Sequence, residues 1–201
     1  MKESALSTGR NEAVKGTDII KKATLLILLG LLSNLLAAEN RFSVTISANF
    51  LEPRDPDYQN KYLSNIFFPQ LKLAYRVTDG FIVWASYSYV RAKGLIPVVE
   101  INTTSTQNLL SFGIGYGGMF SELFSWQVEA GLVSFDYKEE ALGETASGSA
   151  LGFNAGGTMF YSFGKMFVEV EAGYLYSKDE ANGTAIKLGG PHGGIGLGFR
   201  F

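Results

Sequence analysis

Apolar residues occupy every second position in eight separate runs of the chain, starting at residue 42. In the first run, the apolar residues from Phe42 to Phe50 alternate with serine, threonine and asparagine. Such a period of two predicts a β-strand with one apolar and one polar face. The eight predicted strands cover residues 42–50, 70–77, 81–89, 110–120, 126–137, 149–163, 166–177 and 195–201.

The segments that connect these strands alternate between short and long. Short connections lie at 78–80, 121–125 and 164–165, and long polar ones at 52–65, 92–107, 138–148 and 178–190. In an up-and-down sheet, all short turns then lie at one end and all long loops at the other. An even number of strands, each near the about 9–11 residues that cross a bilayer, is typical of outer-membrane barrels. The sequence therefore predicts an all-β fold, an eight-stranded antiparallel up-and-down transmembrane β-barrel, closed so that no edge strand faces lipid.

The polar face of the predicted strands has the composition of a barrel interior. Many of its members are glycine and serine, whereas a water-exposed face would carry more long charged side chains. Eight strands leave room inside only for side chains. The alternative, a soluble barrel or sandwich with its apolar residues inside, fits this composition less well. The charged members form a predicted lumen charge network of three cations and three anions, namely Lys72, Arg76, Glu129, Glu169, Glu171 and Arg200.

Matched charges in a filled lumen are typical of a structural network, because unpaired charges are costly to bury. The last two predicted strands are neighbours, so we expect Glu169 or Glu171 to pair with Arg200. A narrow channel for small, including hydrophobic, solutes is the second interpretation of these charges.

Aromatic residues gather near the ends of the predicted strands. Two belts of rings, one at each membrane interface, are expected of a transmembrane barrel. The short-turn belt comprises Phe42, Phe81, Phe120, Trp126, Phe163 and Phe201, and the long-loop belt comprises Phe50, Tyr87, Tyr89, Tyr174 and Tyr176.

The segment before the first strand has the features of an export signal. Lys21 and Lys22 precede an uncharged run, Ala23 to Ala38, that is shorter than a spanning helix and ends in small residues. We therefore predict a signal peptide over residues 1–38, with a long polar n-region and cleavage after Ala38, and a barrel over 39–201. An uncleaved membrane anchor is the alternative.

Composition narrows the function further. With 46% hydrophobic and 13% aromatic residues, the chain is too apolar for a disordered protein. A net charge of -2 argues against a nucleic-acid surface. The absence of cysteine excludes disulfides and thiolate metal sites, and a single histidine excludes a multi-histidine site. We expect no metal and no cofactor.

The carboxyl terminus resembles a known signature. Ile195, Leu197, Phe199 and the terminal Phe201 look like the signal by which bacterial outer-membrane proteins are passed to the barrel-assembly machinery. Residues 41–201 as a whole resemble the small outer-membrane β-barrel family that includes the OmpA membrane domain, OmpX, OmpW and opacity-type proteins.

This resemblance implies a monomer in the bacterial outer membrane, with both mature termini in the periplasm and four loops outside. It also implies contact with outer-membrane lipid and lipopolysaccharide. Members of such a family differ in their loops and activities, so the implied role is only structural or surface-interacting. An extracellular ligand would be bound through the long loops, for example Glu52–Tyr58, although charges there also serve simply to keep loops solvated.

An enzyme is the least supported interpretation. Similar barrels that modify lipid A use a histidine with a nearby serine or acid, and the single histidine here is His192, predicted at the rim. The serine expected two residues later is Gly194 instead, so no catalytic residue is predicted. The glycines from Gly113 to Gly118 lack the following helix of a nucleotide site, and we interpret them as room for larger lumen side chains.

Overall fold

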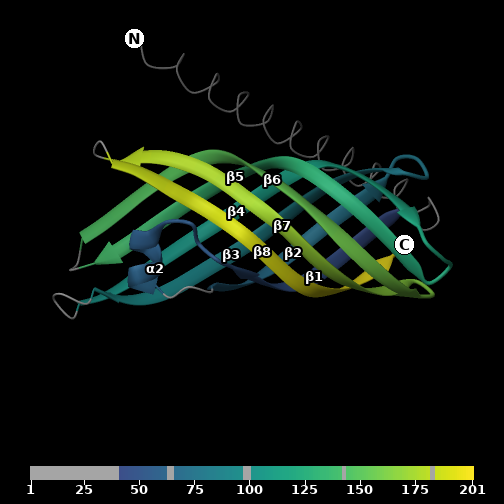
Figure 1. Cartoon of the computed structure of the whole chain (residues 1–201), viewed down its shortest axis with the longest axis horizontal. Helices are drawn as coiled ribbons and strands as arrows, with labels where there is room; N and C mark the ends of the chain where they lie inside the picture. The colour runs from purple at the N-terminus through teal and green to yellow at the C-terminus, as the bar shows by residue number, and fades with distance from the viewer. Residues whose placement is uncertain (1–40, 63–65, 97–100, 142–143, 182–183) are drawn as a thin grey trace, which may run out of the picture. The chain divides into compact units, whose positions relative to one another are not determined.

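The computed structural model describes residues 41–62, 66–96, 101–141, 144–181 and 184–201 (Figure 1). The predicted signal peptide, residues 1–38, lies outside these described residues. No helix in the described ranges is long and apolar enough to cross a membrane.

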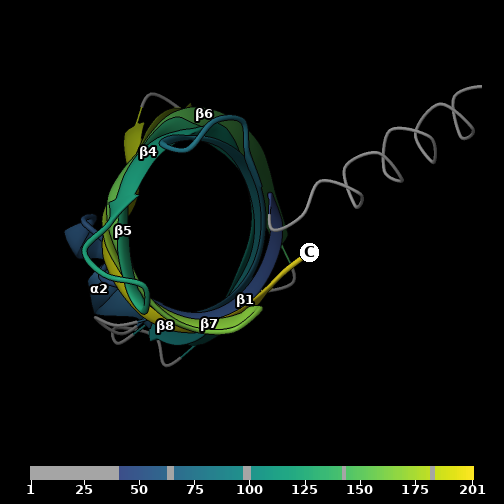
Figure 2. The same cartoon turned by 90° about the vertical axis from the view of Figure 1, so that its right-hand side faces the viewer.

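Eight antiparallel strands form a closed barrel in chain order, β1 to β8, with β8 pairing back to β1. Seen along its axis the sheet is a complete ring (Figure 2). The predicted eight-stranded up-and-down barrel is confirmed. Its elements are β1 (Phe42–Leu51), α2 (Pro56–Tyr62), β2 (Ile66–Arg76), β3 (Phe81–Ile96), β4 (Ile101–Met119), β5 (Phe124–Ala141), β6 (Glu144–Phe163), β7 (Met166–Ala181) and β8 (Thr184–Arg200).

The short turns lie where the sequence places them, at the end of the barrel that also holds Phe201. In the first, the backbone N–H of Val77 donates to the oxygen of Phe81 at 2.8 Å. The third turn contains Gly164, whose φ of 70° suits glycine. We call this end of the barrel the terminal end and the opposite end the α2 end.

The strands are much longer than the sequence predicts. β4, β5 and β6 contain 19, 18 and 20 residues. With β3, β7 and β8, they include most of the predicted loops 92–107, 138–148 and 178–190. The prediction was wrong because it followed apolar residues on one face only. Toward the α2 end, the apolar residues move to the other face, and the outward positions become polar.

We call the strand parts nearest the α2 end the extension, comprising residues 90–96, 101–109, 135–141, 144–150, 177–181 and 184–190, most of which the sequence did not predict as strand. Its outward positions carry charged or hydroxyl side chains, such as Lys93, Thr104 and Lys138. Its interior joins a buried apolar core made of Leu51, Tyr62, Ile66, Phe68, Val90, Ala92, Leu109, Val133, Phe135, Tyr137, Ala150, Leu175 and Leu188. The extension thus has a polar outer wall, and its interior combines this apolar core with buried polar side chains such as Ser105 and Gln107.

The rest of the wall has the opposite polarity. Outward side chains such as Ile46, Leu110 and Val170 are each more than half exposed, at 67%, 55% and 58%. An apolar band of this kind is stable only against an apolar solvent such as the lipid hydrocarbon. The polarity of the barrel therefore inverts along its axis.

Both aromatic belts face outward. At the terminal end, Phe42 and Phe199 each contact Phe201, with ring centroids 5.8 and 5.0 Å apart. In the other belt, Phe50 lies near the end of β1, as predicted, and contacts Phe67 with ring centroids 5.6 Å apart. Its tyrosines on β3 and β7 do not lie at strand ends, because these two strands continue past them into the extension, so this belt marks the boundary between the two polarities.

The predicted loop 52–65 contains helix α2, which compensates for the short β1 and β2. Asp55 caps the helix: its side-chain oxygen accepts from the backbone N–H of Tyr58 at 3.4 Å, and Pro56 occupies the first helical position. From α2, the Tyr62 hydroxyl lies 2.7 Å from the Thr103 hydroxyl inside the barrel, and Tyr62 is only 2% exposed. Tyr62 is therefore part of the core, whereas the charged Glu52 and Arg54 earlier in the same segment are exposed.

Candidate functional site

The lumen is the candidate functional site, because the predicted charged residues lie there. From the α2 end to the terminal end it holds three layers. The apolar core described above comes first, a layer of ions and amides comes second, and a cavity lined by arginines comes third. Each layer draws its residues from the inward positions of several strands.

The ionic layer is centred on Lys72 of β2. Its ammonium lies 2.7 Å from both carboxylate oxygens of Glu129 on β5 and 4.0 Å from Glu171 on β7. The ammonium also lies 5.4 Å from the ring centroid of Trp84. Gln127 donates to Glu129 at 2.8 Å, so this carboxylate is held from two sides.

Amide and hydroxyl side chains fill the lumen beside the ions. Asn49 donates to the Ser47 hydroxyl at 3.1 Å and to Gln70 at 3.4 Å. Gln70 in turn donates to the Ser86 hydroxyl at 3.4 Å. These bonds connect β1, β2 and β3 across the interior and leave the layer filled by side chains.

The prediction that Glu169 or Glu171 forms an ion pair with Arg200 is wrong. Among the described residues, Lys72 is the ion-pair partner of Glu171, and Arg200 forms no ion pair. The β7–β8 register explains this, since Glu169 lies opposite Gly196 and Arg200 lies beyond the last pair, Met166 with Phe199. Glu169 is 1% exposed, and its Oε1 has no hydrogen-bond partner in the described barrel.

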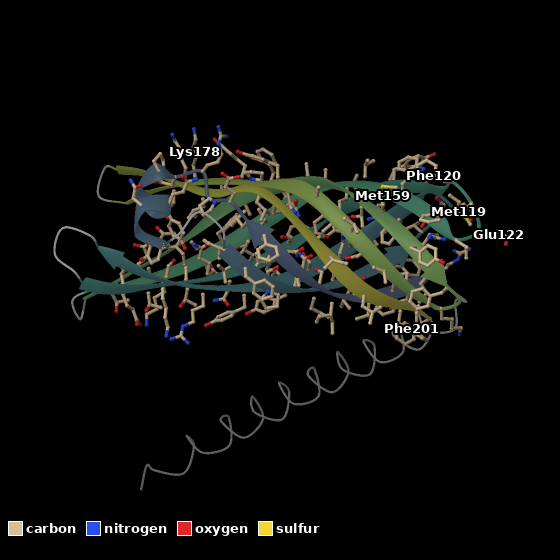
Figure 3. The ribbon with its side chains drawn as sticks, turned by 60° about the horizontal axis from the view of Figure 1, so that its bottom comes forward. Met119, Phe120, Glu122, Met159, Lys178 and Phe201 are labelled. Carbon is tan, nitrogen blue, oxygen red and sulfur yellow. The ribbon has the colours of Figure 1, made fainter. Side chains whose placement is uncertain are left out.

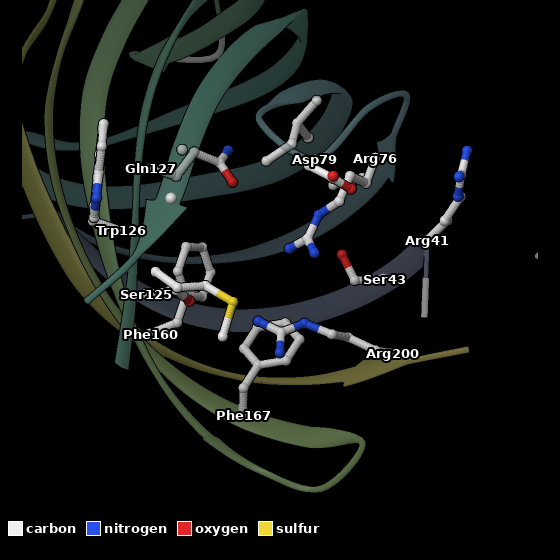
Figure 4. A pocket seen from close by; sticks show the side chains of 15 residues that line it. Arg41, Ser43, Arg76, Asp79, Ser125, Trp126, Gln127, Phe160, Phe167 and Arg200 are labelled. Carbon is white, nitrogen blue, oxygen red and sulfur yellow. The ribbon is translucent and has the colours of Figure 1, made fainter. Parts of the chain in front are cut away.

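Arg76 and Arg200 lie apart from the ionic layer, at the terminal end. They line a cavity of about 430 Å³ together with Arg41, which sequence reasoning missed (Figure 4). Arg41 precedes the first apolar alternation and therefore gave no strand signal. The predicted network of three cations and three anions is thus two sites, one with Lys72 and three carboxylates and one rich in arginine.

His192 lies inside the barrel rather than at its rim. It occupies the middle of β8, opposite Leu51 of β1 and Gly173 of β7. Its Nδ1 is buried and has no hydrogen-bond partner in the part of the chain that the structure describes. Within the same part, no group of acidic or histidine side chains is arranged to hold a metal ion.

The assembly-signal residues lie on the outer surface of β8. Ile195, Leu197 and Phe199 are 58%, 51% and 39% exposed and face outward, as the alternation predicts. Their role in assembly stays a prediction.

Three cations lie on the outer surface at the α2 end, next to Asp55, whose carboxylate accepts from the backbone N–H of Lys187 at 3.3 Å. Lys178 of β7 and Lys187 of β8 are directly opposite each other in the sheet, an unfavourable arrangement for like charges. Nearby, Arg54 donates to the Tyr174 hydroxyl at 2.6 Å. Figure 3 shows Lys178 projecting from the α2 end, far from Phe120 and Phe201. We call Arg54, Lys178 and Lys187 the outer basic surface.

No protein-family model matches the sequence, and no curated protein matches it. The structure, in contrast, is similar to solved barrels. One is Ail, the attachment invasion locus protein of Yersinia pestis, in complex with the heparin analogue sucrose octasulfate. It has 17% identity and a TM-score of 0.55, over 81% of this chain and 99% of Ail.

A second similar structure is Neisserial surface protein A (NspA). It has 16% identity and a TM-score of 0.56, over 80% of this chain and 97% of NspA. At these low sequence identities, the structural similarity concerns the fold alone. Together with the closed ring of eight antiparallel strands, it shows that this chain has the fold of the small bacterial outer-membrane β-barrels.

Proposed function

We propose that this protein is a bacterial outer-membrane barrel with a filled lumen, whose role is to present the extension at the cell surface for interaction. The observation that carries the proposal is the inversion of polarity along the wall. The apolar band between the aromatic belts suits lipid, and the polar wall of the extension suits water. In this orientation the α2 end is extracellular and the terminal end faces the periplasm.

The lumen argues against transport. Lys72 with its carboxylates and the apolar core above it occupy successive levels of an eight-stranded interior. In planar bilayers, the purified protein is therefore expected to give no discrete conductance steps. Steps that persist after further purification would favour the narrow-channel alternative.

An enzymatic role has little support in the lumen. His192 has no serine or carboxylate hydrogen-bonded to its Nδ1 within the described barrel, so neither a nucleophile nor an orienting group is in place there. We expect cells with wild type and His192→Ala to have the same lipid A.

The outer basic surface is the proposed point of contact with a polyanion. Two lysines held opposite each other repel, and a ligand with several anionic groups would relieve that repulsion. Ail was crystallised with a sulfated sugar, which supports testing a ligand of this class. Lipopolysaccharide phosphates and sulfated glycans share this chemistry.

The test is binding of sucrose octasulfate to the purified protein in a non-ionic detergent. The Lys178→Gln/Lys187→Gln variant should bind at least about fivefold more weakly, because each exposed charge contact contributes up to about 1 kcal/mol. Lys93→Gln, on the outer face of β3, is the matched control and should bind like wild type. Equal affinity of all three proteins would overturn the assignment of this surface.

A further inference from the structure

The described residues that line the cavity at the terminal end carry more positive than negative charge. Its lining includes Arg41, Arg76 and Arg200 and one acidic residue, Asp79. The described ion pairs involve only Lys72 and Lys138 as cations. Asp79 therefore makes no ion pair with the arginines, and the described lining has an excess of positive charge.

The donors of two of these arginines are largely unused. The guanidinium of Arg200 donates to the Ser162 hydroxyl at 2.9 Å and lies 4.7 Å from the centroid of Phe167. Arg76 has no side-chain hydrogen bond or ion pair with any described residue. In Figure 4, the guanidinium groups of Arg76 and Arg200 point into the cavity near the Ser43 hydroxyl, whereas Arg41 points away. Each guanidinium carries five donors, so most of them face the open volume.

Two like charges pointing into one cavity are unfavourable without a counterion. Charge repulsion and partial burial both destabilise this arrangement. The sheet nevertheless holds the two side chains close together, because Arg76 ends β2 and Arg200 ends β8, and these strands lie on either side of β1. An oxyanion between them would accept from both guanidiniums and from Ser43. Paired guanidinium donors of this kind match the oxygens of phosphate.

We propose that this cavity is a binding site for a phosphate group carried by a small organic molecule or by a lipid. A phosphate monoester carries a charge of about −1.5 to −2 near neutral pH and has three acceptor oxygens, which suits two arginines and one hydroxyl. Ile82, Phe160 and Phe167 line the same cavity and provide apolar contacts for the rest of the molecule. This site is separate from the outer basic surface and goes beyond the proposed function.

The first test is titration calorimetry with glycerol 3-phosphate and the full chain folded in dodecyl maltoside at low salt. Wild type should bind saturably, and glycerol should not bind. Arg76→Gln and Arg200→Gln should each weaken binding about tenfold or more, because a charge-assisted hydrogen bond is lost. Lys93→Gln, at the other end of the barrel, should leave the affinity unchanged.

Controls separate loss of the site from loss of the fold. Each variant is refolded in vitro, and its heat-dependent shift on unboiled gels must match wild type. Arg200→Lys keeps the charge but loses the forked donors, so its affinity should lie between those of wild type and Arg200→Gln. Absence of binding to wild type, equal binding to the Arg76→Gln/Arg200→Gln variant, or tighter binding of glutarate than of glycerol 3-phosphate would overturn the proposal.

Native mass spectrometry of protein extracted from membranes, rather than refolded, distinguishes the source of the phosphate. A phospholipid retained by wild type and lost in the Arg76→Gln/Arg200→Gln variant would assign the site to a lipid headgroup. A glycerol 3-phosphate adduct without retained lipid, sensitive to the same substitutions, would assign it to a soluble phosphate compound. No arginine-dependent adduct of either kind would contradict the proposal.

Discussion

At the residue scale, Lys72 is the residue whose charge compensates the buried carboxylates of the ionic layer. Its ammonium is the cation that the structure places within 4.0 Å of both Glu129 and Glu171, and all three side chains are almost fully buried. Removing one partner of such a cluster leaves buried charge without compensation, which costs more than the ion pair itself contributes.

We therefore expect Lys72→Met to lower the free energy of unfolding by about 3–5 kcal/mol. The measurement is urea unfolding of the refolded protein in lipid vesicles, followed by tryptophan fluorescence. Lys93→Met, on the exposed face of β3, should change stability by no more than about 0.5 kcal/mol. A Lys72→Met protein as stable as this control would show that the ionic layer is not a structural network.

Gly190 is a second residue whose identity is fixed by its surroundings. Its φ is 155°, and a Cβ at this position would lie 1.9 Å from the backbone oxygen of Glu52. This close approach allows two backbone hydrogen bonds to β8. The N–H of Glu52 donates to the oxygen of Pro191 and the N–H of Arg54 donates to the oxygen of Gly189, both at 3.0 Å.

Gly190→Ala is expected to destabilise the barrel by about 1–3 kcal/mol, because both the backbone angle and the contact must change. Gly157→Ala is the matched control, since its Cβ would meet only the Gln127 oxygen, at 3.6 Å. The same unfolding assay applies. Equal stability of the two variants would contradict the close approach of residue 52 to β8.

At the element scale, α2 closes the extension where β1 and β2 stop short. Tyr58 and Tyr62 carry the contact: Gln107 donates to the Tyr58 hydroxyl at 3.1 Å, and the Tyr62 hydroxyl lies 2.7 Å from that of Thr103. Burial raises the pKa of Tyr58 to about 12 and also raises the pKa of Tyr62. The neutral phenols are therefore favoured in the packed state.

The pH dependence of this contact follows from the sign of the shift. The stabilisation is fully present below the ordinary tyrosine pKa of 10.0 and is lost as the pH rises toward about 12. The rate of protease cleavage within residues 52–62 should therefore increase over this pH range. The rate is measured in short pulses and is divided by the activity of the protease on an unstructured substrate at each pH. In Tyr58→Phe the increase should be smaller, and a cleavage rate independent of pH in wild type would contradict the packing of α2.

The sequence predicted the membrane-facing part of each strand but not the extension. Leu110, Phe112 and Ile114 alternate with small residues, and this regular pattern predicted β4 correctly near the terminal end. From Asn108 to Thr104 the outward positions are polar, and the inward partners include Ser105 and Gln107, so no alternation was visible there. Burial of those polar residues depends on α2, which is a tertiary contact.

The candidate site was predicted only in part, for a similar reason. Alternation alone placed all six charged residues in the lumen, but their heights along the barrel depend on strand register. The register brings Lys72 of β2 near Glu129 of β5 and keeps Arg200 away from Glu169. Arg41 joins Arg76 through a backbone bond, from the N–H of Arg76 to the Arg41 oxygen at 2.8 Å, which no sequence pattern signals.

At the scale of the whole molecule, the central claim is that one wall changes polarity along the barrel axis. Lipid faces the outward side chains between the aromatic belts, and water faces those of the extension. The chain contains no cysteine, so single cysteines can be introduced and spin-labelled without a background signal.

The most direct test is the accessibility of such labels to oxygen and to a water-soluble nickel complex, in refolded protein in lipid vesicles. Labels at Leu110, Leu132 and Val170 should be accessible to oxygen and protected from nickel. Labels at Thr104, Lys138 and Lys178, on strands of the same sheet, should show the reverse. Nickel accessibility at all six positions, or oxygen preference throughout, would contradict the inversion and with it the proposed place of this barrel in the membrane.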